Sequence, residues 1–574
     1  MKKSKLSETM KQLKSFFSWR ILSFVLLSAI VVATSCTKDF DEINTNPNAI
    51  AKPGAAELPF LFSKAQSTAT QNGWNYQVSQ NLFADQYAQY FGCRATYFAS
   101  DRMFIVMNWV SAAFDPMYAD VVPQLQTIMG TYDPQSLDAD GIPDYTKFTT
   151  PESAIASIMW VFAFHQVTDY WGPIPYFKVG IAATSVTYDA QDLIYDDFLK
   201  RLASASAILK ATSQTNAYGS FDLIYGGDIS KWIKFSNTLR LRLALRISAV
   251  DPARAKTEAE AAVAAGVMLS SGDDALIKRS NVGKGDFNGL SIMSPWDEFR
   301  MSASMESALT GYSDPRLSVY FQPALATGTY EGLRNGLSVA DLGLDVHSPD
   351  RLSHVGVRWS DFATTTNPTP GGNKLIKIPN PGEGIEIPSN VLHAAEAFFL
   401  RAEGAVNGWN MGATAQTLYE AGIAASMNQW GITKVADITA YTNNTATPKA
   451  PGDFISAIPG NTSPALNSTP VLFGGTVAIQ REQIAMQKWL ALFPNGMEAW
   501  ADYRRQHKTL KLYPIPNSDN TDIAASASLN GTTWIRRIPF LASEFNRNKD
   551  GVTAGVGKLE GPDKVTTRLW WDKN

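Results

Sequence analysis

The chain has 574 residues and a formal net charge of −3. Residues 1–35 hold six basic groups and one acid, so the remainder of the chain carries −8. A mildly acidic balance excludes proteins that bind nucleic acid by neutralising its phosphates. The length exceeds the roughly 250–300 residues that one hydrophobic core supports, which predicts several domains or an array of repeats. Two cysteines are too few for a disulfide framework.

The N-terminus has the order of a secretory signal, a basic stretch to Arg20 followed by the apolar segment 21–34. The apolar part is shorter than the ~20 residues of a membrane-spanning helix, and small residues lead directly to Cys36. This ending looks like a lipobox, which predicts acylation of Cys36; the alternative is an ordinary cleavage site. Two or more acyl chains would anchor the protein stably. The expected organisation is a lipoprotein signal peptide at 1–35, an acylated tether at 36–53 and a folded domain at 54–574.

Amphipathic helical patterns dominate the chain from residue 151 onward. In one of them Trp232, Phe235, Leu239 and Leu243 follow each other at three- and four-residue steps. Paired segments of this kind with short connections predict a mainly α fold of tetratricopeptide-like antiparallel helix pairs, although no strict 34-residue repeat is visible. The predicted helical segments are 151–171, 189–210, 230–249, 253–266, 390–408, 412–430 and 476–507.

A long segment, about 269–388, breaks the helical pattern with Gly, Pro, Asp and Ser and with isolated aromatic residues. Loops of this length inside a compact protein are usually functional or disordered. The scattered aromatic and apolar side chains favour ordered loops, so we expect this loop-rich insertion to carry a binding face.

Several separated motifs together resemble the SusD/RagB family of nutrient-binding outer-membrane lipoproteins, in particular its SusD-like branch. The motifs occur in the same order as in the family and cover nearly the whole chain after Cys36. One position in the last motif differs, because Leu541 stands where the family has proline. The matching segments are CTKDFDEINTNPN at 36–48, DYWGPIPY at 169–176, KWIKFSNTLRLRLALRIS at 231–248, DPRL at 314–317, AAEAFFLRAEGAV at 394–406, IQREQIAMQKWLALFPNGMEAWADYRR at 479–505 and RRIPFLASEFNRN at 536–548.

This resemblance implies a tetratricopeptide-like receptor that acts as a lid on a SusC-like TonB-dependent barrel transporter. It implies a lipid-anchored protein at the outer face of the outer membrane that captures a nutrient, commonly an oligosaccharide, without chemical change. The residues after the cysteine resemble a signal for surface export, here Lys38, Asp39, Asp41 and Glu42.

An oligosaccharide receptor needs exposed aromatic rings, because a ring covers the C–H face of a pyranose and leaves the hydroxyl groups free for hydrogen bonds. Two or three rings suffice for weak, reversible capture. For each candidate ring the competing interpretation is burial in the core. The candidates are Trp74, Tyr76, Tyr97, Trp296, Tyr312 and Tyr330. We assign to the core Trp160, Trp232, Trp489 and Trp500.

The arginines in these motifs are better explained as structural residues than as ligand-binding ones. We expect pairing with carboxylates or helix ends for Arg240, Arg242, Arg246 and Arg316. No nucleophile elbow, phosphate-binding loop or dinucleotide fingerprint is present, and we predict no catalytic residue and no cofactor.

Metal signatures are weak. His393 and Glu396 lack the second histidine of a zinc motif. Two groups of alternating oxygen ligands lack the glutamate at position twelve of a calcium loop, which leaves calcium as a minor alternative. These groups are Asp138, Asp140 and Asp144, and Asn546, Asn548 and Asp550. Two other functions stay open, a surface glycoside hydrolase and a helical-repeat scaffold that binds only proteins.

Overall fold

Helix α6, Pro151–Trp171, shows how local sequence sets the elements of this fold. Thr150 caps the helix by accepting a hydrogen bond from the Ser153 amide, and Pro151 occupies the first turn, where its missing N–H costs nothing. Gly172 ends the helix with a φ of +86°. Nearly every side chain of α6 is buried, so this helix lies inside the protein and its neighbours pack around it.

The computed structural model describes residues 53–181, 183–280, 282, 285–359, 386–458, 460–523 and 534–573. The predicted signal peptide, the proposed acylation site Cys36 and nearly all of the predicted tether lie outside the described residues.

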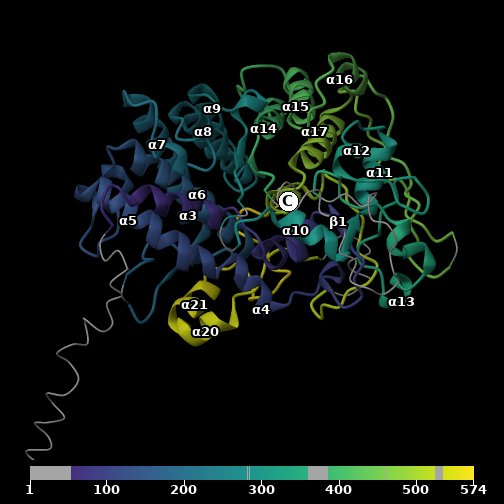
Figure 1. Cartoon of the computed structure of the whole chain (residues 1–574), viewed down its shortest axis with the longest axis horizontal. Helices are drawn as coiled ribbons and strands as arrows, with labels where there is room; N and C mark the ends of the chain where they lie inside the picture. Colours follow the sequence, from purple (N-terminus) through teal and green to yellow (C-terminus); the bar gives the residue numbers. More distant parts are fainter. Residues whose placement is uncertain are drawn as a thin grey trace, which may run out of the picture. The chain divides into compact units, whose positions relative to one another are not determined.

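Two groups of helices form the tetratricopeptide-like part of the fold (Figure 1). The first group is α6, α7 (Gln191–Ala211), α8 (Ile229–Arg246) and α9 (Pro252–Ala265). The second group is α14 (Ala394–Val406), α15 (Ala415–Gln429), α17 (Val477–Leu492) and α18 (Gly496–Gln506). Consecutive helices of the first group pack on each other, and α14 joins the groups by packing on α8, α15 and α17.

The prediction of a mainly α fold built on these helical segments is therefore confirmed. Two details are wrong. The predicted helix 390–408 begins with a strand at Ser389–Leu392, and the segment 476–507 forms two helices. Pro494 lacks the amide hydrogen that a continuous helix needs, and Asn495 then caps α18 by accepting a hydrogen bond from the Glu498 amide.

Shorter elements fill the rest of the described chain. The helices are α3 (Leu58–Ala69), α4 (Met107–Val110), α5 (Val122–Tyr132), α10 (Gly289–Met293), α11 (Ala303–Gly311), α12 (Leu317–Tyr320), α13 (Val339–Leu342), α16 (Val435–Thr442), α20 (Ala542–Arg547) and α21 (Lys549–Val556), with π-helices at Gln77–Asp85 and Met117–Val121. The strands pair antiparallel in twos, β1 (Phe91–Cys93) with β5 (Phe299–Met301), β2 (Ile174–Pro175) with β3 (Tyr188–Asp189), and β4 (Ala275–Ile277) with β6 (Ser389–Leu392).

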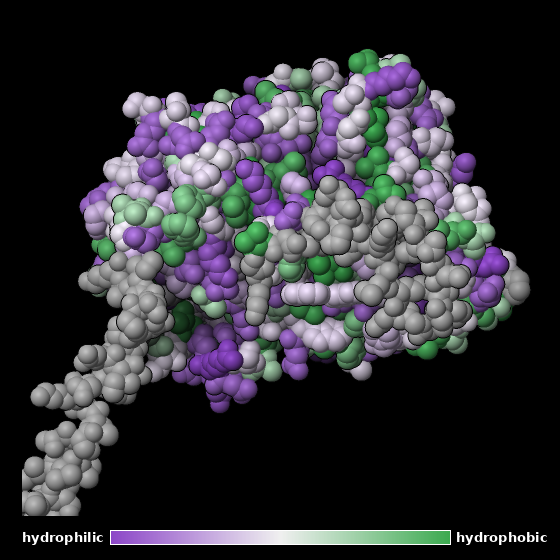
Figure 2. All heavy atoms as spheres, viewed as in Figure 1, coloured by the Kyte–Doolittle hydropathy of each residue, from purple (hydrophilic) through white to green (hydrophobic). Residues whose placement is uncertain are grey.

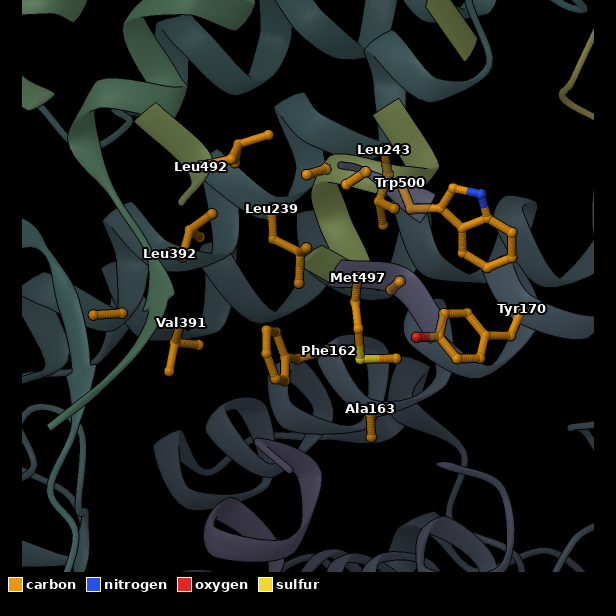
Figure 3. Packing of buried hydrophobic residues seen from close by; sticks show 14 of the residues in the cluster. Phe162, Ala163, Tyr170, Leu239, Leu243, Val391, Leu392, Leu492, Met497 and Trp500 are labelled. Carbon is orange, nitrogen blue, oxygen red and sulfur yellow. The ribbon is translucent and has the colours of Figure 1, made fainter. Parts of the chain in front are cut away.

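One large hydrophobic core extends through most of the described chain, and Figure 3 shows the part of it where side chains from α6, α8, α18 and β6 lie together. The four tryptophans assigned to the core are buried, which confirms that part of the sequence analysis. Their exposed fractions are 5% for Trp160, 0% for Trp232, 1% for Trp489 and 0% for Trp500.

Buried ion pairs connect the helix groups. Arg242 of α8 makes two hydrogen bonds of 2.6 Å to Glu396 of α14, and Arg246 of α8 donates to both oxygens of Glu498 on α18 at 2.7 and 2.6 Å. Arg240 and Arg316 also pair with carboxylates, as expected of structural arginines. A buried charge is tolerated only when it is paired and hydrogen-bonded, so these contacts specify how the helices meet.

The surface on the side shown in Figure 2 has hydrophilic and hydrophobic residues interspersed. Within the described ranges, no helix has both the length and the hydrophobicity needed to cross a bilayer.

Candidate functional site

Two exposed tryptophans form the most distinctive side-chain group on the surface. Trp74 is 55% exposed and Trp296 is 39% exposed. Their rings are parallel, with an interplanar angle of 7° and centroids 5.5 Å apart, and Phe287 meets the edge of Trp74. Together with Tyr97, which is 70% exposed, we call these tryptophans the aromatic platform.

Glycines allow the two loops that carry Trp74 and Trp296 to approach each other. Gly73 has a φ of +48°, and a Cβ atom there would lie 2.2 Å from the carbonyl oxygen of Gly285. A Cβ atom on Gly289 would lie 2.2 Å from the Cβ of Tyr76. Larger residues at these two positions would force the loops apart. The short distance between the indoles thus depends on backbone contacts that only glycine permits.

Ion pairs hold the turn after Trp296 in its conformation. Asp297 adopts a left-handed conformation with a φ of +67°, which aspartate tolerates better than most residues. Its carboxylate pairs with Arg300 and with His354. Burial alone would raise the pKa of Asp297, but the Arg300 guanidinium and His354 hold it well below its usual range. Asp297 is thus an anchor for the turn that presents Trp296.

Polar groups lie beside the rings. The Tyr97 hydroxyl donates a hydrogen bond to Oε1 of Glu298 at 2.9 Å, and Nε2 of Gln77 donates to Oε2 at 2.6 Å. Pairing of β1 with β5 brings these residues together, and the Arg94 amide continues the pairing by donating to the Glu298 carbonyl at 2.9 Å. Partial burial raises the pKa of Glu298, although both hydrogen bonds oppose the shift.

This arrangement suits a ligand with one apolar face and many hydroxyl groups. The indoles supply flat apolar surface, while Glu298 is an acceptor and the Gln77 amide a donor at the border of that surface. A saccharide ring has this combination of a C–H face and a polar rim.

The other candidate rings lie elsewhere, and the expectation for two of them is corrected. Tyr76 is 8% exposed and donates its hydroxyl to Asp85, and Tyr312 is 1% exposed and donates to the Thr469 carbonyl. Both rings belong to the core, and Tyr76 also lines a hollow together with Gln80 and Trp430. Tyr330 is half-buried and packs against the core.

Gln77 and Arg94 were missed by the sequence analysis, because the residues they contact near Trp296 are about 200 positions away. Glu298 could be noticed only as a neighbour of Trp296. A local pattern contains no information on such distant partners, and the strand pairing that joins them is only three residues long.

The predicted calcium groups are occupied by protein contacts. The Lys178 ammonium lies 2.6 Å from Asp140 and 3.9 Å from Asp138, so it takes the place of a cation. The Asn548 side chain makes hydrogen bonds to the backbone of Val186. In the part of the chain that the structure describes, no three His, Cys, Asp or Glu side chains gather as a metal site would require.

Comparisons with known proteins agree with this fold. None of the curated proteins searched matches the chain. A chitin-binding SusD homologue from Flavobacterium johnsoniae is 34% identical, with a TM-score of 0.74 over 90% of this chain and 98% of that one. SusD homologues from Bacteroides uniformis and Bacteroides vulgatus are 27% and 29% identical, with TM-scores of 0.74 and 0.73 over 91% and 90% of this chain and 100% and 97% of theirs.

The family model described as SusD-like, SusD and RagB outer membrane lipoprotein matches residues 42–572. The match covers almost the entire chain after the predicted tether, in agreement with the motifs found in the sequence. The chain therefore belongs to the SusD/RagB family of outer-membrane lipoproteins.

Proposed function

We propose that this protein is a surface-exposed lipoprotein that binds an oligosaccharide on the aromatic platform and delivers it intact to a partner TonB-dependent transporter. Family membership supports the receptor role and the outer-membrane location. The single structural observation that carries the ligand class is the parallel, exposed pair of Trp74 and Trp296 beside Glu298.

Chitin oligosaccharides are the first ligands to test. A structure that is 34% identical over most of the chain is a chitin-binding SusD homologue, and another similar structure is called a chitin-binding protein. N-acetylglucosamine also fits the chemistry of the platform. Its amide N–H can donate a hydrogen bond to Glu298, and the apolar face of its ring can pack on the indoles.

The platform predicts weak, reversible binding. If a sugar covers about 60 Å² of apolar indole surface, each ring contributes roughly 1.5 kcal/mol, or about tenfold in affinity. Two rings together contribute roughly 3 kcal/mol, less than the roughly 4.1 kcal/mol of a millimolar dissociation constant, so polar contacts must supply the rest and the binding is expected to be weak. Such affinity suits a receptor that must release its ligand to a transporter.

The direct test is calorimetric titration of chitohexaose into the purified protein and into Trp74→Ala, Trp296→Ala and the double variant. We expect about tenfold weaker binding for each single variant and no measurable binding for the double variant, while circular dichroism should show that every variant keeps the helical fold. Phe545→Ala is the matched control, since Phe545 is an exposed ring (38%) on α20. Equal affinity of all variants would remove the platform as the binding site.

Anchoring and partnership are tested separately. Mass spectrometry of the N-terminal peptide should find diacylglycerol and an amide-linked chain on Cys36, and solubilised outer membranes should yield the protein together with a large transporter. An unmodified thiol in the mature protein would contradict the proposed anchor.

A further inference from the structure

A hollow lies in another part of the protein, away from the aromatic platform. Its volume is about 180 Å³, and it is formed by α5, the turn at Tyr145–Lys147, α6, the residues that follow β2, and α7. This volume is below the roughly 300–1,000 Å³ of typical ligand pockets, so the hollow has room for one small ring. None of the residues that line it belongs to the aromatic platform, and Figure 1 draws α5 and α7 far from α10, which precedes Trp296.

Arg201 is the central polar group of this pocket. The residue is only 8% exposed, and its Nε donates to Asp197 at 2.9 Å. Among the contacts of the described residues, neither Nη nitrogen has a hydrogen-bond acceptor, although Arg201 lines the hollow. The Nη nitrogens are not among the buried atoms that lack a partner, so they reach solvent through the hollow. An oxygen acceptor of a ligand could replace water at these donors.

Aromatic rings hold this guanidinium in place. Its Cζ atom lies 4.4 Å from the centre of the Tyr145 ring and 5.9 Å from that of Trp160. Tyr176, whose hydroxyl donates to Asp197, and Phe177 extend the aromatic wall. Tyr145 is half-buried and Phe177 is 37% exposed, so rings are accessible at the mouth of the pocket.

The charges of the pocket are balanced. Arg201 is paired with Asp197, and Asp144 lies 3.4 Å from the Lys147 ammonium. A charged ligand would gain no net attraction here, whereas a neutral ring with oxygen acceptors would meet both the aromatic wall and the free N–H groups.

We infer that this pocket, which we call the Arg201 pocket, is a second saccharide subsite that takes one uncharged sugar ring, with Arg201 donating to a hydroxyl or acetamido oxygen and Tyr145 covering the ring. The choice of a saccharide rests on the proposed function, while the need for an acceptor-bearing ring follows from the pocket itself. The platform and the Arg201 pocket would then bind independently.

The test uses saturation-transfer NMR on the purified full-length protein with N-acetylglucosamine and glucose as probes. The Trp74→Ala/Trp296→Ala variant should still transfer saturation to at least one probe. Adding Tyr145→Ala to that variant should weaken the remaining binding about tenfold. Because an Arg201 substitution alone leaves Asp197 buried and unpaired, the paired change Arg201→Gln/Asp197→Asn serves as the second variant and should have the same effect.

The outcomes separate the two sites. If removal of the tryptophans abolishes all transfer, or if Tyr145→Ala and the paired change leave the remaining transfer unaltered, the Arg201 pocket binds no saccharide and the platform still stands. If Tyr145→Ala alone abolishes transfer while removal of the tryptophans has no effect, the pocket stands and the platform fails. Phe60→Ala is the control, an exposed ring (59%) on α3 outside the pocket.

Discussion

The helix groups and the platform loops use the same residue types in opposite ways. Trp232 and Trp500 in the helix groups are fully buried, whereas Trp74 and Trp296 lie on loops and keep much of their surface exposed. In the helices, burial follows from a three- and four-residue periodicity that turns one face toward the core. In the loops, exposure follows from backbone contacts between distant glycines.

Charged groups show the same contrast. Arg246 in α8 spends its hydrogen bonds on a buried carboxylate, while Glu298 at the platform is half-buried and accepts from only two side chains. A carboxylate has room for about four hydrogen bonds, so Glu298 retains capacity for a ligand. The buried ion pair thus specifies how the helices meet, while the half-buried carboxylate can still accept a hydrogen bond from a ligand.

The largest expected effect is on stability in the helix groups. Arg246→Met leaves Glu498 without its bidentate partner in the core and should lower the free energy of unfolding by about 3–5 kcal/mol. Arg254→Met removes a partly exposed pair with Asp196 and should cost about 0–1 kcal/mol. Urea unfolding followed by circular dichroism measures the free energy of unfolding of both variants. Equal losses would contradict the expected difference between the buried and the partly exposed ion pair.

An intermediate effect is expected where the loops meet. Gly289→Ala places a methyl group against Tyr76 and should cost about 1–3 kcal/mol of stability. Because it separates the loops that carry the indoles, it should also weaken chitohexaose binding by more than threefold. Gly272→Ala is the control, since its new Cβ would meet its nearest neighbour at an ordinary 3.4 Å. Unchanged binding by Gly289→Ala would show that the spacing of the indoles is unimportant.

The smallest effect is expected at the polar border of the platform. Tyr97→Phe removes the hydrogen bond to Glu298 but keeps the ring, so affinity for chitohexaose should fall by about two- to tenfold, or roughly 0.5–1.5 kcal/mol, with no loss of stability. Tyr330→Phe should leave affinity unchanged, because Tyr330 packs against the core. Titration calorimetry compares the affinities of the two variants. Weaker binding by Tyr330→Phe together with unchanged binding by Tyr97→Phe would place the site near Tyr330.

Sequence periodicity predicted the helices well, because the residues that specify a helix lie close together in the sequence. The cap and proline at the start of α6 and the apolar stripe of α8 lie within a few residues of each other, and both helices begin and end close to their predicted positions. The short helix α11 was not predicted, since it is a nine-residue helix inside a Gly- and Ser-rich segment where no stripe is long enough to detect.

For the candidate site, local sequence identified the right residue type but not its environment. Trp74 and Tyr76 are two positions apart, yet one ring is exposed and the other is buried with its hydroxyl on Asp85. The direction of each ring depends on the opposite loop around Gly289, more than 200 residues away, and no pattern near residue 74 contains that contact.

Residues close together in the chain were enough to predict the helical class, the family resemblance and the structural role of the buried arginines, because periodicity, caps and motifs lie within short segments. The folded structure was needed to show which aromatic rings reach solvent, that Lys178 pairs with Asp138 and Asp140, and that Arg201 faces a hollow. Exposure and pairing are properties of contacts between distant segments, and these exist only once the chain has folded.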